Sequence, residues 1–383
     1  MSELSPPDSS ASLAEARRVM NLCNVCSYCT GYCAVFHASE QRPDLTRDDL
    51  HYLANLCHNC RACWYACQYA PPHEFAINVP ATLARVRHDS YRRYTWPSAF
   101  AALLARSGPA TLMVSLVATL LIPLLTLILV PWDTLFAVHR EAGAFYQVIP
   151  WGVMTTVALV TLGTSVLALG IGVARFRRDI GRGAPPASSW WRALPRAAAD
   201  LLTLRNLDGG GGGCNDVDGR FTQWRRGFHH ALFYGFLLCL AATTVAAGYH
   251  HLLAWEAPYP VFSLPVLLGT LGGMGMMVGA AGLVWVKRRG DPAPTAAETL
   301  PADYALLGLL FAVAATGLML LALRETATMG LLLALHLGTV LGFFLLVPYS
   351  KFVHGAYRGA ALLRRAMEQH HGPGTAGKET DKE

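Results

Sequence analysis

Long apolar runs separated by polar connections dominate the chain after residue 100. Each run is free of Asp, Glu, Lys and Arg, and each reaches the length of about 20 helical residues that crosses a hydrocarbon core. Helices buried in soluble domains rarely stay uncharged over such a length. The pattern therefore predicts a lipid bilayer and six membrane-spanning helices: Thr111–Val130, Val148–Ala174, Phe228–Leu253, Val261–Val286, Tyr304–Leu323 and Thr328–Tyr349.

The composition agrees with this pattern. Hydrophobic residues make up 53% of the 383 residues and charged residues only 15%, against about 25% charged in a soluble domain. A wholly soluble protein is therefore excluded. The net charge of +6 would suit nucleic acid, but the basic residues lie in short clusters beside the apolar runs. Their positions fit orientation in a membrane instead, and we expect no nucleic-acid partner.

The same basic clusters orient the predicted spans. Basic side chains precede the first span and follow the second, fourth and sixth, whereas the opposite loops contain little beyond Arg140 and Arg324. By the positive-inside rule, the N- and C-termini are cytoplasmic. The first 22 residues have no apolar core, so we expect no secretory signal and a multi-pass protein of the cytoplasmic, inner cell membrane.

This reading divides the chain into parts. We expect an all-α protein with a cytoplasmic domain at 1–100, a membrane domain at 101–368 with a cytoplasmic loop at 175–227, and a polar tail at 369–383. The run Gly209–Gly213 lies in that loop. It lacks the Lys-Ser or Lys-Thr and the preceding strand of a phosphate-binding loop. A flexible linker or a close backbone approach is the better interpretation.

Eight of the ten cysteines lie between Cys23 and Cys67, in two groups with identical spacing. Each group reads C-x2-C-x2-C-x3-C, which is the spacing that binds paired [4Fe–4S] clusters. In two-cluster proteins, the fourth cysteine of each group ligates the other cluster. We therefore assign Cys23, Cys26, Cys29 and Cys67 to one cluster, and Cys57, Cys60, Cys63 and Cys33 to its neighbour.

Structural zinc is the alternative for these cysteines, because four-cysteine zinc sites also use C-x2-C pairs. Two identical groups of four cysteines are more than zinc needs, which favours clusters. Between the groups, Thr46 and Asp49 resemble a capping box, and the apolar positions from Leu50 to Cys57 share one helical face. The domain is therefore predicted to be an α-helical, two-cluster ferredoxin-like unit with little strand, followed by a six-helix transmembrane bundle.

Histidines in membrane spans are costly unless paired or ligated, so each is a functional candidate. Two adjacent pairs, His229–His230 and His250–His251, open and close the third span, and either member of each pair could ligate. The third and sixth spans run antiparallel, which makes one or two haem b sites geometrically possible. Hydrogen bonding between helices is the alternative role. The candidate axial ligands are His230 with His354 on the cytoplasmic side, and His250 with His336 on the other.

Several segments together resemble the tricarballylate utilisation protein B family, also called CitB-like proteins: Cys23–Cys67, Ala70–Pro80, Gly209–Cys214 and Arg225–Phe236. The likeness covers nearly the whole chain. It implies a membrane electron-transfer protein that reoxidises the flavin of a separate tricarballylate dehydrogenase and passes electrons to the quinone pool. A more distant likeness, to the haem b membrane subunits of nitrate and heterodisulfide reductases, rests on His336 and Pro348–His354. There the corresponding histidines are axial ligands.

The residues alone indicate the same path, since cluster ligands lie outside the bilayer and histidines lie inside it, where quinone is the abundant acceptor. No dinucleotide-binding fingerprint follows a strand, so the flavin (FAD) belongs to a partner flavoprotein dehydrogenase. The chain itself is then an oxidoreductase component. Two other functions stay open: a tricarboxylate transporter, which the lack of Arg or Lys in the spans disfavours, and a membrane-docked iron–sulfur redox sensor.

Overall fold

The computed structural model describes residues 9–100, 107–182 and 190–370. Over these ranges the chain is helical, with one isolated antiparallel bridge between Cys214 and Thr222 and no strand. This confirms the all-α fold class. The predicted polar tail lies outside the described residues from position 371 onward, as does part of the predicted loop, 183–189.

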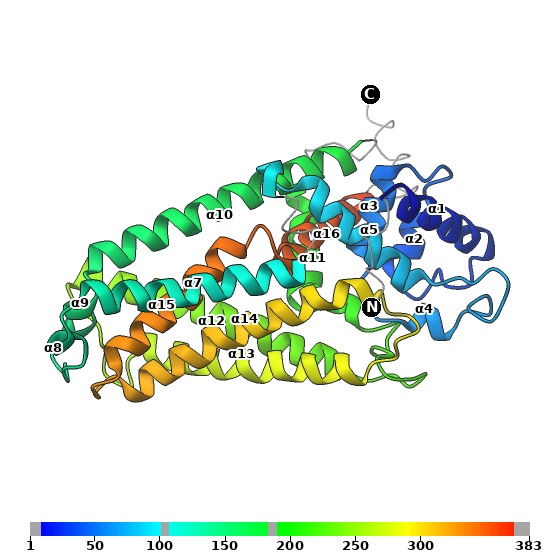
Figure 1. The fold of residues 1–383 in the computed structure, drawn as a ribbon. Helices are drawn as coiled ribbons and strands as arrows, with labels where there is room; N and C mark the ends of the chain where they lie inside the picture. Colours follow the sequence, from blue (N-terminus) through cyan, green and yellow to red (C-terminus); the bar gives the residue numbers. More distant parts are fainter. Residues whose placement is uncertain (1–8, 101–106, 183–189, 371–383) are drawn as a thin grey trace, which may run out of the picture.

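Six of the described helices are long and apolar enough to cross a membrane. Figure 1 shows them side by side in one elongated bundle, with the short helices α8 (Trp132–Leu135) and α9 (Ala144–Val148) at one end. Each predicted span falls on one of the six, which confirms the six-helix bundle. They are α7 (Ser107–Leu129), α10 (Trp151–Ile180), α12 (Trp224–Leu253), α13 (Leu264–Arg289), α14 (Leu300–Leu323) and α15 (Met329–Leu346).

Two features suit these helices to a bilayer. The outer face of α7 exposes Leu112, Leu116 and Leu120 together, and an apolar face of this kind is stable in contact with lipid. Between α12 and α13 the backbones approach closely, because a Cβ atom on Gly235 would lie only 2.7 Å from the carbonyl oxygen of Gly272. Small residues at helix contacts are typical of membrane bundles.

The N-terminal helices gather at the opposite end of the bundle from α8 and α9 (Figure 1). The predicted capping box is present, since the Thr46 hydroxyl accepts from the Asp49 N–H and the Asp49 carboxylate accepts from the Thr46 N–H. Leu50 and Leu53 on the following helix are fully buried. The helices are α1 (Ser9–Cys26), α2 (Ala34–Glu40), α3 (Arg47–Leu56), α4 (Ala62–Tyr65) and α5 (Val79–Tyr94).

Helices from the C-terminal half complete the core of this ferredoxin-like unit. α11 (Trp190–Leu202), which lies within the predicted loop, packs against α16 (His354–His370). The rings of Tyr94, Phe176 and Tyr357 meet in the same core, with centroids 5.2 to 6.2 Å apart. The unit is therefore built onto the membrane bundle and shares buried side chains with it.

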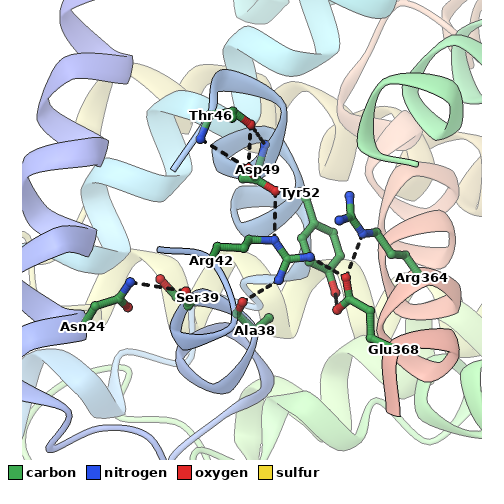
Figure 2. Close-up of polar contacts among 9 residues, drawn as sticks. All are labelled: Asn24, Ala38, Ser39, Arg42, Thr46, Asp49, Tyr52, Arg364 and Glu368. Atoms are coloured by element: carbon green, nitrogen blue, oxygen red, sulfur yellow. Dashed lines mark hydrogen bonds and ion pairs between the residues drawn. The ribbon is translucent and has the colours of Figure 1, made fainter. Parts of the chain in front are cut away.

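Figure 2 shows the polar contacts that fasten α2 and α3 to α16. Arg42 donates to Asp49 at 2.9 Å and also pairs with the carboxylate of Glu368. The Tyr52 hydroxyl donates to the same carboxylate at 2.9 Å, and Arg364 donates to it at 2.8 Å. All five residues of this network are largely buried, so removal of one member of an ion pair would leave an uncompensated buried charge.

Candidate functional site

Four of the predicted cluster cysteines line one cavity near the protein surface. We call Cys23, Cys26, Cys29 and Cys67 the first set; they surround about 190 Å³. The first two lie in the last turns of α1, the third in the turn that follows, and the fourth just beyond α4. Val25 and Tyr28 beside them are 87% and 65% exposed. A docked protein would therefore come close to this cavity.

The other four cysteines line a second, smaller cavity of about 20 Å³. We call Cys33, Cys57, Cys60 and Cys63 the second set. Asn59 and Arg61 have positive φ values of 57° and 69°, which turn the backbone twice between Cys57 and Cys63. Left-handed conformations are costly for such residues and are concentrated at functional sites. The Asn59 N–H also donates to Cys57 Sγ at 3.4 Å.

Each set joins three cysteines of one sequence group to the fourth cysteine of the other. The structure thus brings together the same crossed sets that the spacing predicts, although their role as ligands stays a prediction. Burial, followed by the nearby sulfurs of the same set, raises the pKa of the Cys23 and Cys29 thiols to about 12. Metal binding releases the thiol protons, so these thiols would become thiolates on binding a cation.

The geometry of the donor atoms bears on the choice between clusters and zinc. Within the described ranges, no three His, Cys, Asp or Glu side chains are close enough to share one metal ion. A zinc site needs four ligands on one ion, with Zn–S distances of about 2.3 Å. Cysteines arranged around a cavity fit a cluster better than they fit single zinc ions.

The glycine-rich loop lies against the second set. Buried Cys214 packs on Cys60, and the Asn215 N–H donates to the Cys60 carbonyl oxygen at 2.9 Å. Gly213 adopts a φ of 113°, and a Cβ atom there would lie 2.4 Å from the carbonyl oxygen of Thr222. This loop is therefore a close backbone approach that covers the second set.

Three arginines hold the backbone of the second set from outside. Arg87 on α5 and Arg358 on α16 donate to the carbonyl oxygen of Cys57, at 2.9 and 3.0 Å. Arg225 on α12 donates to the carbonyl oxygen of Asn59 at 2.5 Å. Burial, followed by repulsion from Arg87, lowers the pKa of Arg358 to about 10, so its guanidinium stays charged at neutral pH.

The structure places His229, rather than the expected His230, beside His354. Their ring centroids are 6.2 Å apart and their planes are nearly perpendicular, at 83°. His354 Nδ1 lies 2.6 Å from the carbonyl oxygen of Lys351, whereas His229 Nδ1 is buried and has no hydrogen-bond partner within the described ranges. Burial and the charge of Arg358 lower the pKa of His354 well below its usual range. The ring of His230 lies against Tyr234 instead.

Within the described ranges, no ring contact or hydrogen bond joins the other two candidate histidines, His250 and His336. The His250 ring stacks on Trp151, with centroids 4.8 Å apart. His336 Nδ1 forms a hydrogen bond of 3.1 Å with the Thr316 hydroxyl of the neighbouring helix α14. For His336, this is the interhelical hydrogen bonding that was the alternative to haem ligation.

In the sequence, Arg87 and Arg358 serve as orienting charges and Arg225 belongs to a segment that carries the family resemblance, so their contact with the second set was missed. The sequence does contain a signal that links two of these arginines to the candidate histidines. Arg225 precedes His229 by four residues on α12, and Arg358 follows His354 by four on α16. Since residues four apart share a helix face, each helix presents an arginine one turn beyond its histidine.

Comparisons with known proteins cover both halves of the chain. A family model described as citrate utilization protein B matches residues 106–374, and one described as its Fer4-like domain matches residues 16–93. Citrate utilization protein B of Escherichia coli is 48% identical over 363 residues, which is 94% of this chain and 93% of the relative. No solved structure matches. The resemblance to CitB-like proteins is thus confirmed, and the chain belongs to the citrate utilization protein B family.

Proposed function

We propose that this protein is the membrane electron-transfer component of a flavoprotein dehydrogenase system in citrate or tricarballylate utilisation. It reoxidises the FAD of a partner dehydrogenase, for which tricarballylate dehydrogenase is our candidate, and delivers the electrons to membrane quinone. One observation supports this most directly: a four-cysteine set accepts backbone hydrogen bonds from Arg225 and Arg358, and each of these arginines lies one helical turn from a member of a histidine pair at the end of the membrane bundle.

In this proposal the first and second cysteine sets each hold a [4Fe–4S] cluster, which supplies one-electron transfer when bound. The donor sets fit: each has four convergent cysteines, and the Asn59 N–H already donates to one sulfur. Oxidation of one reduced flavin releases two electrons and two protons, and reduction of one quinone to quinol consumes both. The cysteines of the first set, near exposed Val25 and Tyr28, face the soluble donor.

His229 and His354 fit one haem b. These two imidazoles, whose ring centroids are 6.2 Å apart, would be the residues that hold its iron, and the haem would supply one-electron transfer within the bilayer. His354 Nδ1 is held by a backbone carbonyl, which leaves Nε2 as the ligating nitrogen. The described residues around His250 and His336 do not form such a pair, and we propose no haem there.

For the location, we propose the cytoplasmic membrane with both termini in the cytoplasm. The support is the distribution of basic residues, since Lys287, Arg288 and Arg289 end α13 on the side of the ferredoxin-like unit. In this orientation the first set would be accessible to a cytoplasmic dehydrogenase.

The test combines the full-length protein, in quinone-containing vesicles, with the partner dehydrogenase and its tricarboxylate substrate. Repeated turnover is expected with wild type and with Cys239→Ser, which alters a cysteine outside both sets. Cys26→Ser is expected to abolish repeated turnover but to leave a single reduction of the flavin. Equal turnover with quinone and without this protein would refute the proposal.

The same vesicles distinguish the other functions. Accumulation of citrate or tricarballylate inside them without electron transfer would favour a transporter. Reduction of the clusters with no reduction of quinone would favour a sensor.

A further inference from the structure

The two cysteine sets lie in different electrostatic surroundings. Around the second set, Arg87, Arg225 and Arg358 direct their guanidinium groups at the backbone of Cys57 and Asn59. Around the first set, the described residues place no arginine hydrogen bond on the backbone of any of its four cysteines. The two sets therefore have the same ligand spacing but lie in different electrostatic fields.

The arginines are placed at a cost that their local contacts do not offset. Arg87 is only 8% exposed, and within the described ranges neither Arg87 nor Arg358 has a carboxylate partner. Arg225 has one, Asp216, at 3.5 Å. A buried guanidinium without a counter-ion is unfavourable unless another negative group compensates it. An anionic cluster in the second set would be that group.

A [4Fe–4S] cluster with four thiolate ligands is negatively charged, and reduction adds one more negative charge. Burial alone disfavours this added charge, whereas nearby positive charges and hydrogen bonds favour it. The second set contains buried Cys57 and has the three cations beside it, and solvent screens a charge less where side chains are buried. The first set, near exposed Val25 and Tyr28, has neither to the same degree.

We infer that Arg87, Arg225 and Arg358 raise the reduction potential of the second cluster above that of the first, so that electrons move inward. The inference rests on the proposed function. In the step concerned, one electron leaves the first cluster, which is oxidised, and reduces the second; no bond forms or breaks and no proton moves. The arginines are positioning residues, because they act through the cluster and touch no substrate.

The positions of the arginines along their helices give this difference in reduction potential a direction in space. Arg225 and Arg358 come from the two helices that supply His229 and His354, one turn of about 5.4 Å further from the bilayer. These two arginines thus connect the histidine pair to the backbone of the second set. The ferredoxin-like unit supplies only Arg87, so the potential depends on its attachment to α12 and α16.

The test is a potentiometric titration of the full-length protein, followed by electron paramagnetic resonance, with Cys67→Ser used to identify the signal of the first cluster. Arg87→Gln and Arg358→Gln are each expected to make the midpoint potential of the second cluster more negative and to leave the first unchanged. Arg358→Lys keeps the charge and is expected to restore most of the shift. Arg365→Gln removes a buried arginine elsewhere on α16 and is expected to change neither potential.

Each other result has a definite meaning. In Arg87→Gln and Arg358→Gln, unchanged midpoint potentials, equal shifts in both clusters, or a shift of the second cluster's potential to more positive values would overturn the inference. The proposed function would still stand. Loss of the second cluster in both Arg358→Gln and Arg358→Lys would also overturn it, because the arginine would then serve only to hold the loop. Wild-type protein without iron and sulfide would instead refute the proposed function.

Discussion

The first cysteine set lies at the surface beside exposed Val25 and Tyr28, whereas the second lies between the ferredoxin-like helices and the membrane bundle. A glycine-rich loop and three arginines contact the second set, and among the described residues the first set has no such contacts. Spacing along the chain is the same in both. The spacing therefore determines which cysteines meet, and the surrounding helices determine how far each site is from solvent and from positive charge.

This difference assigns separate roles to two sites of equal chemistry. A surface site exchanges electrons with a soluble protein, because electron transfer requires close approach. A buried site next to the membrane helices exchanges them with groups in the bilayer. The contacts of Arg225 and Arg358 make the second role depend on helices that are 160 residues or more away from Cys57 in the sequence.

Substitution of single cysteine ligands should give the largest difference between the two sets, because each substitution is expected to remove one cluster. Wild-type protein purified without oxygen is expected to contain about eight iron and eight sulfide per chain. Cys33→Ser is expected to remove the cluster of Cys57, Cys60 and Cys63, and Cys67→Ser the other, because the sets are crossed. Iron analysis and magnetic spectra check both. If Cys33→Ser removes the signal that Cys67→Ser also removes, the crossed assignment is wrong, and zinc without sulfide would exclude clusters altogether.

Substitution of adjacent histidines tests the link between the second set and the bilayer. His229→Ala and His354→Ala are each expected to abolish the b-type absorption bands of reduced membranes, because each removes an axial ligand. His230→Ala is the matched control and should retain the bands, since that ring lies against Tyr234. Loss of the bands in His230→Ala with retention in His229→Ala would reverse the assignment.

The histidine pair also marks a limit of sequence reasoning. Hydrophobic runs located all six spans, and the capping box at Thr46 located the start of α3, because both signals are local. The choice between His229 and His230 is different. Neighbouring helix residues point about 100° apart, so the choice depends on how α12 rotates against α16, which no local pattern specifies.

The surroundings of the second set were hidden for the same reason. Arg358 belongs to a basic cluster that orients the membrane helices, and that function by itself explains its presence in the sequence. Its hydrogen bond to the Cys57 carbonyl oxygen joins residues 301 positions apart. The cysteine spacing, in contrast, spans only the 45 residues from Cys23 to Cys67 and repeats once, which made the crossed sets predictable.

The loop that covers the second set can be tested with two glycines of similar φ. Gly211→Ala and Gly213→Ala both force a non-glycine residue to positive φ, near 114° and 113°, which costs roughly 1–3 kcal/mol. Only Gly213→Ala also forces a Cβ atom against Thr222, so it is expected to displace the loop. Loss of the second cluster in air should be faster in Gly213→Ala than in Gly211→Ala. Equal rates would mean that the loop does not shield the second set.

The smallest expected effect is the loss of stability in acid through helix α3, which leads into the second set. His51 on α3 is 2% exposed, its Nδ1 lies 3.3 Å from the Tyr94 hydroxyl, and burial followed by the charge of Arg93 lowers its pKa to about 4. The unfolded chain, with a histidine pKa near 6.5, therefore binds more protons between about pH 6.5 and 4. Stability is complete above this window and is lost as pH falls through it.

One such proton changes the free energy of unfolding by at most roughly 1.4 kcal/mol per pH unit within that window. The thermal unfolding midpoint of wild type is expected to fall from pH 7 to pH 5, and His51→Phe to reduce the fall. His37→Phe, which alters an exposed histidine on α2, should behave as wild type. A fall of the same size in His51→Phe and wild type would show that His51 does not set the acid response. Helix α3, which leads into the second set, would then be no more sensitive to acid than the helices around the first set.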